Sequence, residues 1–225
     1  MYQGFTDIRG GGHFSGRLTA PLVCIGSLCR QYLLEKGIGI SAAITKIGGL
    51  DNTAEVGISQ EITQLIQEKA KEGDSVGGKV RCRASGIPSG IGGPLFEGVE
   101  CVISRLMFGI PAVKAVEFGI GTEFANLSGS SANDEYAVCG GKVVTKTNNN
   151  GGILGGITTG SDIDFTVTFK PTPSIYKAQQ SVNLKTMENT ELKIEGRHDP
   201  CIVLRAVPVV EAVTAFGIMD MVIRI

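Results

Sequence analysis

Residues 163–169, with the sequence IDFTVTF, alternate apolar and polar side chains along their length. Successive side chains of a β-strand point to opposite faces, so this alternation predicts a strand with one face in the core. Segments on either side of it carry related signals. Residues 38–47, 79–84 and 113–119 predict three further strands, and residues 191–195 are a candidate for a fifth.

The segments between these strands have the residue spacing of helices. Apolar residues that recur every three or four positions predict helices over residues 15–35, 59–72, 97–108 and 205–224. On the first helix they keep to one side, at Leu18, Leu22, Ile25, Leu28 and Tyr32.

Capping and breaking residues refine these helices. Ser15 and Ser59 stand at the N-cap positions of the first and second helices, and Gly37 is a plausible stop. Pro21 should kink the first helix or mark its early turns. Pro208 should lie near the first turn of the last helix.

The alternation of strands and helices indicates the α/β or α+β class. The chain has 225 residues, which fits one domain over residues 1–225. Residues 120–156 are polar and rich in glycine, and they predict a long, partly ordered loop of a kind that is often functional.

Composition limits the function. Hydrophobic residues make up 42% of the chain and charged residues 19%, and the formal net charge is -1. The composition is globular, and the charge gives no indication of a nucleic-acid or anionic-membrane partner. The six cysteines form no CxxC pair, and two histidines are too few for a zinc site. With no signal peptide and no apolar stretch judged long enough to span a bilayer, we expect a cytoplasmic protein with reduced thiols.

Glycine is the outlier, with 32 residues that cluster at 10–12, 90–93 and 151–156. Glycine permits tight turns and lets the backbone approach another group closely. Turns are the more common reason for such clusters, and a loop that cradles a ligand is the alternative.

Two glycine clusters belong to motifs that suit an anion. In RGGGHFSGR, residues 9–17, a glycine loop leads into a helix N-terminus with Ser15 and Arg17, so N–H groups, the helix dipole and a guanidinium converge. Capping alone, with His13 as an exposed loop residue, is the alternative. In GGILGGITTG, residues 151–160, the backbone can approach an anion or an aromatic ring, but neither a P-loop nor a dinucleotide fingerprint is present.

Two further motifs lie outside the glycine clusters. KPTPS at 170–174 offers a lysine, two hydroxyls and two rigid prolines, which could hold a phosphate or form an ordinary polar turn. In GRHDPC at 196–201, Arg197, His198 and Asp199 stand side by side. An arginine beside a carboxylate keeps it ionised, and an ionised aspartate can act as a base or orient one. A surface ion pair at the helix entrance is the alternative.

Four motifs in this order resemble those of the chorismate synthases. They are RGGGHFSGRLTAPLV from residue 9, NNNGGILGGITTG from residue 148, KPTPS at 170–174 and GRHDPCIVLRAVPVVEA from residue 196. The segment IPAVKAVEFG at 110–119 belongs to the same resemblance, which covers essentially all 225 residues. An unrelated nucleotide-binding protein is therefore disfavoured.

The resemblance implies a fold and a reaction. The fold would be α+β, a β-α-β sandwich that is incomplete at the N-terminus here, and the assembly a homotetramer. The reaction would be the 1,4-anti elimination of phosphate from 5-enolpyruvylshikimate 3-phosphate, which gives chorismate in the shikimate pathway to the aromatic amino acids. The cofactor would be reduced FMN, with NADPH only as a possible reductant of the flavin.

The resemblance also assigns roles to residues. Asp199 matches the active-site aspartate thought to help the flavin N5 accept the substrate proton. Flavin contacts are matched by His13, Phe14, Ser15, Pro111, Ala112, Gly155, Lys170, Pro171, Thr172, Pro173, Ser174 and Arg197. Substrate contacts are matched by Ser15, Arg17 and Arg197, and no metal is implied. Many members have Arg in place of His13 and Asn in place of Pro111, so those contacts differ.

Charge supports the same arrangement. Flavin phosphate and substrate are anionic while the chain is nearly neutral, so Arg9, Arg17, Lys170 and Arg197 should gather around them.

The chain departs from the family at its start. Family members carry a portion before the position of Met1, with one histidine in a GESHG-like motif and one in an RPGHAD-like motif. These histidines are thought to protonate the departing phosphate and the reduced flavin, and His13 and His198 lie in other motifs. A general acid contributes roughly 10²–10⁴-fold, so we expect a lyase fragment with little turnover alone. The alternative is a non-catalytic binding or assembly module, with residues 205–224 at an interface.

Overall fold

The structure is a computed structural model that describes residues 9–196 and 198–223. Its centre is an antiparallel five-stranded sheet in the order β2-β1-β3-β9-β4. The strands are β1 (Gly39–Ile47), β2 (Leu50–Asp51), β3 (Gly78–Ser85), β4 (Val113–Phe118) and β9 (Ile163–Phe169). The predicted bounds of β9 are confirmed, and those of β1, β3 and β4 are correct to within one residue.

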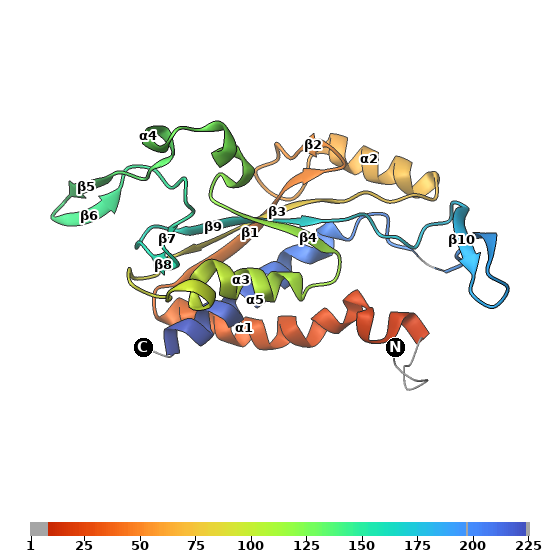
Figure 1. The fold of residues 1–225 in the computed structure, drawn as a ribbon, viewed down its shortest axis with the longest axis horizontal. Coiled ribbons are helices and arrows are strands. Elements are labelled where there is room, and N and C mark those ends of the chain that lie inside the picture. The colour runs from red at the N-terminus through yellow and green to blue at the C-terminus, as the bar shows by residue number, and fades with distance from the viewer. Residues whose placement is uncertain (1–8, 197, 224–225) are drawn as a thin grey trace.

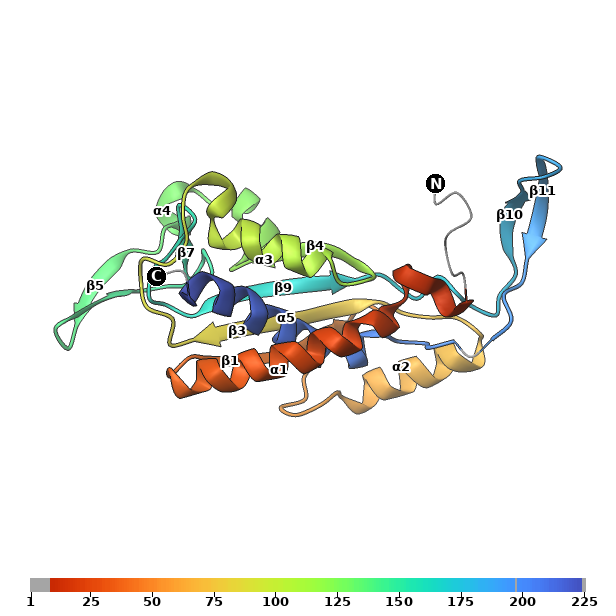
Figure 2. The same cartoon turned by 90° about the horizontal axis from the view of Figure 1, so that it is seen from below.

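Three helices form a layer on one face of this sheet (Figures 1 and 2). They are α1 (Thr19–Glu35), α3 (Val99–Phe108) and α5 (Val203–Ile223). The fourth, α2 (Gln60–Lys71), lies on the other side of the sheet near β2 (Figure 1). All four correspond to predicted helices, so the α+β class is confirmed.

The core lies between the sheet and the helical layer. In β9 the side chains of Ile163, Phe165, Val167 and Phe169 are all buried, as the alternation predicts. The residues that alternate with them lie on the opposite face. Asp164 is buried there as well, and Arg81 offsets the cost of that burial by donating to it from Nε at 2.7 Å and from Nη2 at 2.6 Å.

The predicted N-cap residues do cap helices, although the segment before α1 differs from the prediction. The Ser59 hydroxyl accepts from the N–H of Ile62 and caps α2, as predicted. The helix predicted from residue 15 is preceded by two 3₁₀ helices, η1 (Arg9–Phe14) and η2 (Gly16–Leu18). Ser15 caps η2 rather than α1. Pro21 is the third residue of α1, within its early turns.

Helix α5 is the core helix of the fold. It begins at Val203, so Pro208 lies inside the helix rather than in its first turn. With 21 residues and a mean hydropathy of 1.8, α5 is long and apolar enough to cross a membrane, and the expectation that no stretch has this length is wrong. More than half of this apolar stretch is buried inside the fold, which is typical of the core helix of a soluble protein.

The expectation of a long, partly ordered loop at 120–156 is wrong. This segment contains η4 (Gly121–Asn126), α4 (Gly129–Ala132), the hairpin of β5 (Tyr136–Cys139) and β6 (Lys142–Thr145), and β7 (Ile153–Leu154). Asp134, which is 7% exposed, organises it by accepting from the Thr147 hydroxyl at 2.6 Å and from the N–H groups of Asn149 and Asn150. Composition does not show that a single buried carboxylate would order this segment through several hydrogen bonds.

A second hairpin differs from the prediction in its position. β11 (Glu188–Leu192) begins before the predicted strand at 191–195, and its partner β10 (Gln179–Asn183) was not predicted. This hairpin extends from the end of the molecule at which β9 finishes (Figure 2). Most of its side chains are exposed, so it lacks the alternation on which strand prediction depends.

The second sheet of a β-α-β sandwich is not evident in the described part of the chain. In Figure 1 no strand lies on the outer side of α1 and α5. Within residues 9–196 and 198–223, the fold is one sheet with one helical layer, plus α2 and three two-stranded sheets.

Candidate active site

Segments that lie far apart in the sequence meet at one end of the central sheet, where β9 ends and β3 begins. The N–H of Lys170, directly after β9, donates to the carbonyl of Ala112 at 2.9 Å. The N–H of Val76, shortly before β3, donates to the carbonyl of Pro200 at 2.9 Å. These bonds bring predicted site residues from three motifs to the same end of the sheet.

The 170–174 loop is anchored by its backbone and leaves one polar side chain without a partner. The Ser75 hydroxyl donates to the carbonyl of Thr172 at 2.7 Å. The Thr172 hydroxyl oxygen is itself buried and has no hydrogen-bond partner among the described residues. A buried hydroxyl normally has a partner, so this oxygen has hydrogen-bonding capacity that the described residues do not use. Lys170 is exposed at the start of the loop.

The backbone next to this loop is strained. Ala112 has φ 73°, a left-handed conformation that costs a non-glycine residue roughly 1–3 kcal/mol and is concentrated at functional sites. Gly77 also allows a close backbone approach, since a Cβ there would lie 2.4 Å from the carbonyl oxygen of Phe169. Both features hold the 110–112 turn and the 170–174 loop tightly against the sheet.

Residues outside the motifs fix the far side of the loop. The N–H of Tyr176 donates to the carbonyl of Gly73 at 3.0 Å, and Lys177 pairs with Asp74 at 2.7 Å. The hydrogen bond from Lys177 holds the pKa of Asp74 below its usual value. Sequence reasoning missed these residues, because about one hundred positions separate the partners and no local pattern links them.

Asp199 is held at the entrance to α5. Its Oδ1 accepts from the N–H of Cys201 at 3.1 Å, and its Oδ2 pairs with the guanidinium of Arg205. The side chain of Asp199 is 24% exposed, so one side of the carboxylate still reaches solvent. Arg205, which pairs with Asp199, lies just inside the helix and was not predicted as its partner, and the predicted pairing with Arg197 stays a prediction. Arg197 lies outside the described residues.

The neighbouring His198 has a structural setting. Its ring packs edge-on against Tyr176, with centroids 4.7 Å apart, and Nε2 lies 3.1 Å from the carbonyl oxygen of Ile194. These contacts fix the position of His198 relative to the loop that follows β9.

The glycine loop at the start of the chain lies at the same end. Figures 1 and 2 both place the beginning of α1 at the end where β9 finishes. The Ser15 hydroxyl accepts from the N–H of Arg17 at 3.2 Å, as a capping residue does. His13, Phe14 and Arg17 are exposed, with 64% of Phe14 accessible.

Gly155 is the exception among the predicted residues. It lies in the turn between β7 and β8 (Ile157–Thr158), beside the start of β9 rather than its end. The seven residues of β9 separate the two places by about 20 Å. The expectation that residues 151–156 share a pocket with the 170–174 loop is therefore wrong within this chain.

Two glycine clusters have a packing role instead. A Cβ on Gly92 would lie 2.2 Å from the carbonyl oxygen of Gly156, and a Cβ on Gly156 would lie 2.5 Å from that of Gly93. The clusters at 90–93 and 151–156 thus allow two backbones to touch. Gly155 itself has open space around it and supplies only the positive φ of 62° that its turn requires.

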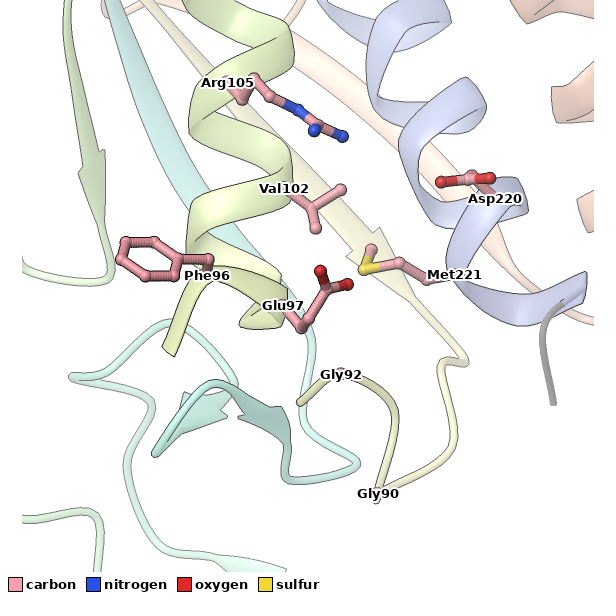
Figure 3. A pocket seen from close by; sticks show the side chains of 8 residues that line it. All are labelled: Gly90, Gly92, Phe96, Glu97, Val102, Arg105, Asp220 and Met221. Carbon is pink, nitrogen blue, oxygen red and sulfur yellow. The ribbon is translucent and has the colours of Figure 1, made fainter. Parts of the chain in front are cut away.

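A hollow of about 290 Å³ lies at this second end, between α3 and the last turns of α5 (Figure 3). It is lined by Gly90, Gly92, Phe96, Glu97, Val102, Arg105, Asp220 and Met221. Of the sequence features, only the glycine cluster at 90–93 contributes to it, and its charged residues come from separate helices that no local pattern links. Among the described residues, no three His, Cys, Asp or Glu side chains are placed to hold a metal ion.

Comparison with known proteins gives the family. A family model described as chorismate synthase matches residues 1–223. The chain belongs to the chorismate synthase family. The resemblance drawn from the four motifs is confirmed, and an unrelated nucleotide-binding protein is excluded.

Several similar proteins are named chorismate synthase. A chorismate synthase of Pyrococcus abyssi is 47% identical, over 97% of this chain and 66% of its own length. One of Thermococcus gammatolerans is 44% identical, over 99% of this chain and 67% of its own length. A solved chorismate synthase structure superposes with a TM-score of 0.77 at 26% identity, over 93% of this chain and 64% of that one. The chain thus spans about two thirds of the length of these relatives.

Proposed function

We propose that this chain carries part of a chorismate synthase active site, at the end of the sheet where β9 finishes. The reaction breaks the bond between C3 and the phosphate oxygen of 5-enolpyruvylshikimate 3-phosphate, removes a proton from C6, and yields chorismate and phosphate. The observation that carries the proposal is the meeting of Ala112, the 170–174 loop and Asp199 at one place in a member of this family.

The 170–174 loop would hold the phosphate of FMN. Thr172 has a buried hydroxyl that no described residue bonds, and Lys170, two residues earlier in the chain, adds an exposed positive charge. A phosphate oxygen accepts hydrogen bonds and carries negative charge, so it satisfies both groups. Pro171 and Pro173 stiffen the loop, which lowers the entropy lost on binding. The residues present therefore fit this cofactor.

The flavin ring would lie toward Ala112 and the glycine loop. Pro111 and Ala112 are half-buried in the strained turn, while His13 and Phe14 are exposed at the same end of the fold. An exposed aromatic ring can pack against a flat apolar surface. Arg17 would bind the anionic substrate next to it.

Asp199 is the residue we assign to proton handling. Its Oδ1 is held by the N–H of Cys201 and its Oδ2 by Arg205, so the orientation of the carboxylate is fixed before any ligand arrives. Reduced FMN, when bound, supplies transient electron donation and a proton acceptor at N5. With the flavin bound at this end of the sheet, the fixed carboxylate of Asp199 would favour the acceptance of that proton.

The family's two histidine motifs have no counterpart in this chain, so turnover would need the remaining third of the domain. The active species would be a cytoplasmic homotetramer, with NADPH as one possible reductant of the flavin. The named relatives favour the lyase over a non-catalytic assembly module.

The test compares FMN binding and chorismate formation. The chain would be co-expressed with the part of the Pyrococcus abyssi relative that lies outside its match to this chain. We expect FMN to bind the complex and chorismate to form, with Asp199→Asn lowering kcat at least about 100-fold and leaving FMN affinity unchanged. Asp51→Asn, an exposed carboxylate elsewhere on the sheet, is the matched control. A complex that binds no FMN and forms no chorismate would refute the proposal.

A further inference from the structure

Tyr176 connects three segments at the end of the sheet where the proposed active site lies. It lies two residues after the 170–174 loop, and its N–H donates to the carbonyl of Gly73 at 3.0 Å. Its hydroxyl donates to the carbonyl of Gly196, which is 20 positions further along the chain. Its ring meets that of His198 edge-on, with centroids 4.7 Å apart. One residue thus joins the end of α2, the 170–174 loop and the entrance to α5.

The bond from Tyr176 to Gly196 closes the base of the β10–β11 hairpin. The ladder of this hairpin ends at the pair of Gln179 and Leu192, so the backbone beyond that pair lies outside the two-stranded sheet. The hairpin extends away from the rest of the fold and most of its side chains are exposed (Figure 2). Segments of this kind have few buried contacts and open easily. With its base closed, movement of the hairpin does not pass to the segment that leads to Asp199.

Tyr176 is held at its backbone as well as at its tip. A Cβ on Gly73 would lie 2.9 Å from the Cβ of Tyr176, so the backbone of Gly73 lies directly against it. Tyr176 also lines a small cavity of about 50 Å³ together with Ile175, His198 and Pro200. These contacts fix the ring, although 46% of the residue is exposed.

We propose that Tyr176 is a positioning residue, which holds Gly196 and His198, and through them Asp199, at a set distance from the 170–174 loop. The inference rests on the proposed function, in which the loop binds the phosphate of FMN and Asp199 handles the proton. These two tasks serve one reaction only if the distance between loop and carboxylate is constant, because a displacement of about 1 Å can cost roughly 100-fold in rate.

Two independent anchors suit Tyr176 to this task. Its backbone holds the loop against Gly73, and its side chain holds the segment before Asp199. On the other side of Asp199, the carbonyl of Pro200 accepts from the segment before β3. The carboxylate therefore lies between two fixed points of the backbone. Removing the hydroxyl of Tyr176 releases the first point, at Gly196, and leaves the second in place.

Tyr176→Phe tests the hydroxyl in the chain alone, because it keeps the ring and the backbone bond. The N–H of Cys201, which donates to Asp199, reports on the position of the carboxylate. We expect its hydrogen exchange, followed by NMR, to be about fivefold faster in Tyr176→Phe, which is the effect of losing one hydrogen bond. The N–H of Lys170, bonded to the carbonyl of Ala112, should exchange at the rate of the parent.

Tyr136→Phe is the matched control. Tyr136 is 57% exposed on β5, and within the described part of the chain no residue bonds its hydroxyl. Exchange at Cys201 should equal that of the parent in this variant. Circular dichroism of both variants should show the helix and sheet content of the parent.

Kinetics of the complex with the remaining part of the Pyrococcus abyssi relative separates positioning from binding. Tyr176→Phe should lower kcat about 10-fold and leave KM and FMN affinity within about twofold, because the backbone anchor of the loop stays. In combination with Asp199→Asn it should lower kcat no further, since Tyr176 acts through that carboxylate. A residue that only stabilised the fold would lower kcat equally with and without Asp199→Asn.

Two results would overturn the proposal. They are unchanged exchange at Cys201 in Tyr176→Phe, and losses of kcat that add in the double variant with Asp199→Asn. A parent complex that binds no FMN and forms no chorismate would count against the proposed function instead. In that case, exchange at Cys201 still decides whether Tyr176 holds Asp199.

Discussion

Replacing Gly26 by alanine tests the contact between α1 and α5. Gly26 is buried in the middle of α1, facing α5. A Cβ built on it would lie 2.3 Å from the carbonyl oxygen of Ala212 and 2.5 Å from its carbonyl carbon and its Cβ. Backbone atoms cannot rotate away from such a clash, so the two helices must separate by about 1 Å to reach ordinary contact.

Two opposing effects set the size of the change. Within an isolated helix, Gly→Ala stabilises by roughly 1 kcal/mol because glycine has the lower helix propensity. Overpacking a buried contact costs about 1–3 kcal/mol, and a clash with backbone belongs at the upper end or beyond. We therefore expect Gly26→Ala to lower the free energy of unfolding by about 2 kcal/mol, which lowers Tm by about 4–8 °C in a domain of this size.

Urea and thermal unfolding followed by circular dichroism would measure the change. Gly129→Ala is the control, because a Cβ there meets nothing within 4 Å, and it should stay within about 0.5 kcal/mol of the parent. Adding Ala212→Gly should restore little, since it removes the contact with Cβ but not the closer one with the carbonyl oxygen. If Gly26→Ala raised stability, the close packing of α1 on α5 would be refuted.

Three further outcomes are expected. Burial alone would raise the pKa of Asp134, but hydrogen bonds from Thr147, Asn150 and Asn149 outweigh it and lower the pKa. The ionised carboxylate therefore stabilises the fold above the unfolded pKa of about 4, and this stabilisation is lost as the pH falls through the folded pKa. Asp134→Asn should lower the free energy of unfolding in urea by about 1–3 kcal/mol at pH 7 and by less toward pH 3, and a difference that does not change with pH would contradict this. Burial raises the pKa of the Cys82 thiol to about 12. In the native protein at pH 8, a maleimide should therefore label the exposed Cys24 at least about 100-fold faster than Cys82, as measured by peptide mass spectrometry. Similar labelling rates would place Cys82 at the surface.

Asp164→Asn belongs to the same set. The carboxylate is 4% exposed and accepts three hydrogen bonds from Arg81 and Arg83, so its loss should cost about 1.5–3 kcal/mol in urea unfolding at pH 7. Asp51→Asn, whose carboxylate is 76% exposed beside Lys46, should cost less than about 0.5 kcal/mol. Equal costs would mean that burial of Asp164 has no energetic effect.

Local patterns predicted the regular elements of the core well. The bounds of β9 followed from alternation, and those of α2 from its apolar stripe and the Ser59 cap. Each signal is complete within about a dozen residues, since it reports which side of one element faces the core. β10 and the elements within 120–156 were missed because most of their side chains are exposed, and the 120–156 segment is organised by the buried carboxylate of Asp134.

The candidate site was predictable only in part. The motifs identified the 170–174 loop, Ala112 and Asp199, which do converge. They also suggested Gly155, which the length of β9 places at the other end of the sheet. Arg205 as the partner of Asp199, and Ser75 and Lys177 as anchors of the loop, come from segments whose approach no local pattern encodes.

The sequence by itself determined the family, the class of fold and most helices and strands, because those depend on residue order and short-range periodicity. Tertiary structure alone decided which motifs share one end of the sheet and why the glycine clusters at 90–93 and 151–156 exist. The physical reason is that strand order and helix packing set distances between segments up to a hundred residues apart, and those distances arise only when the whole core is buried together.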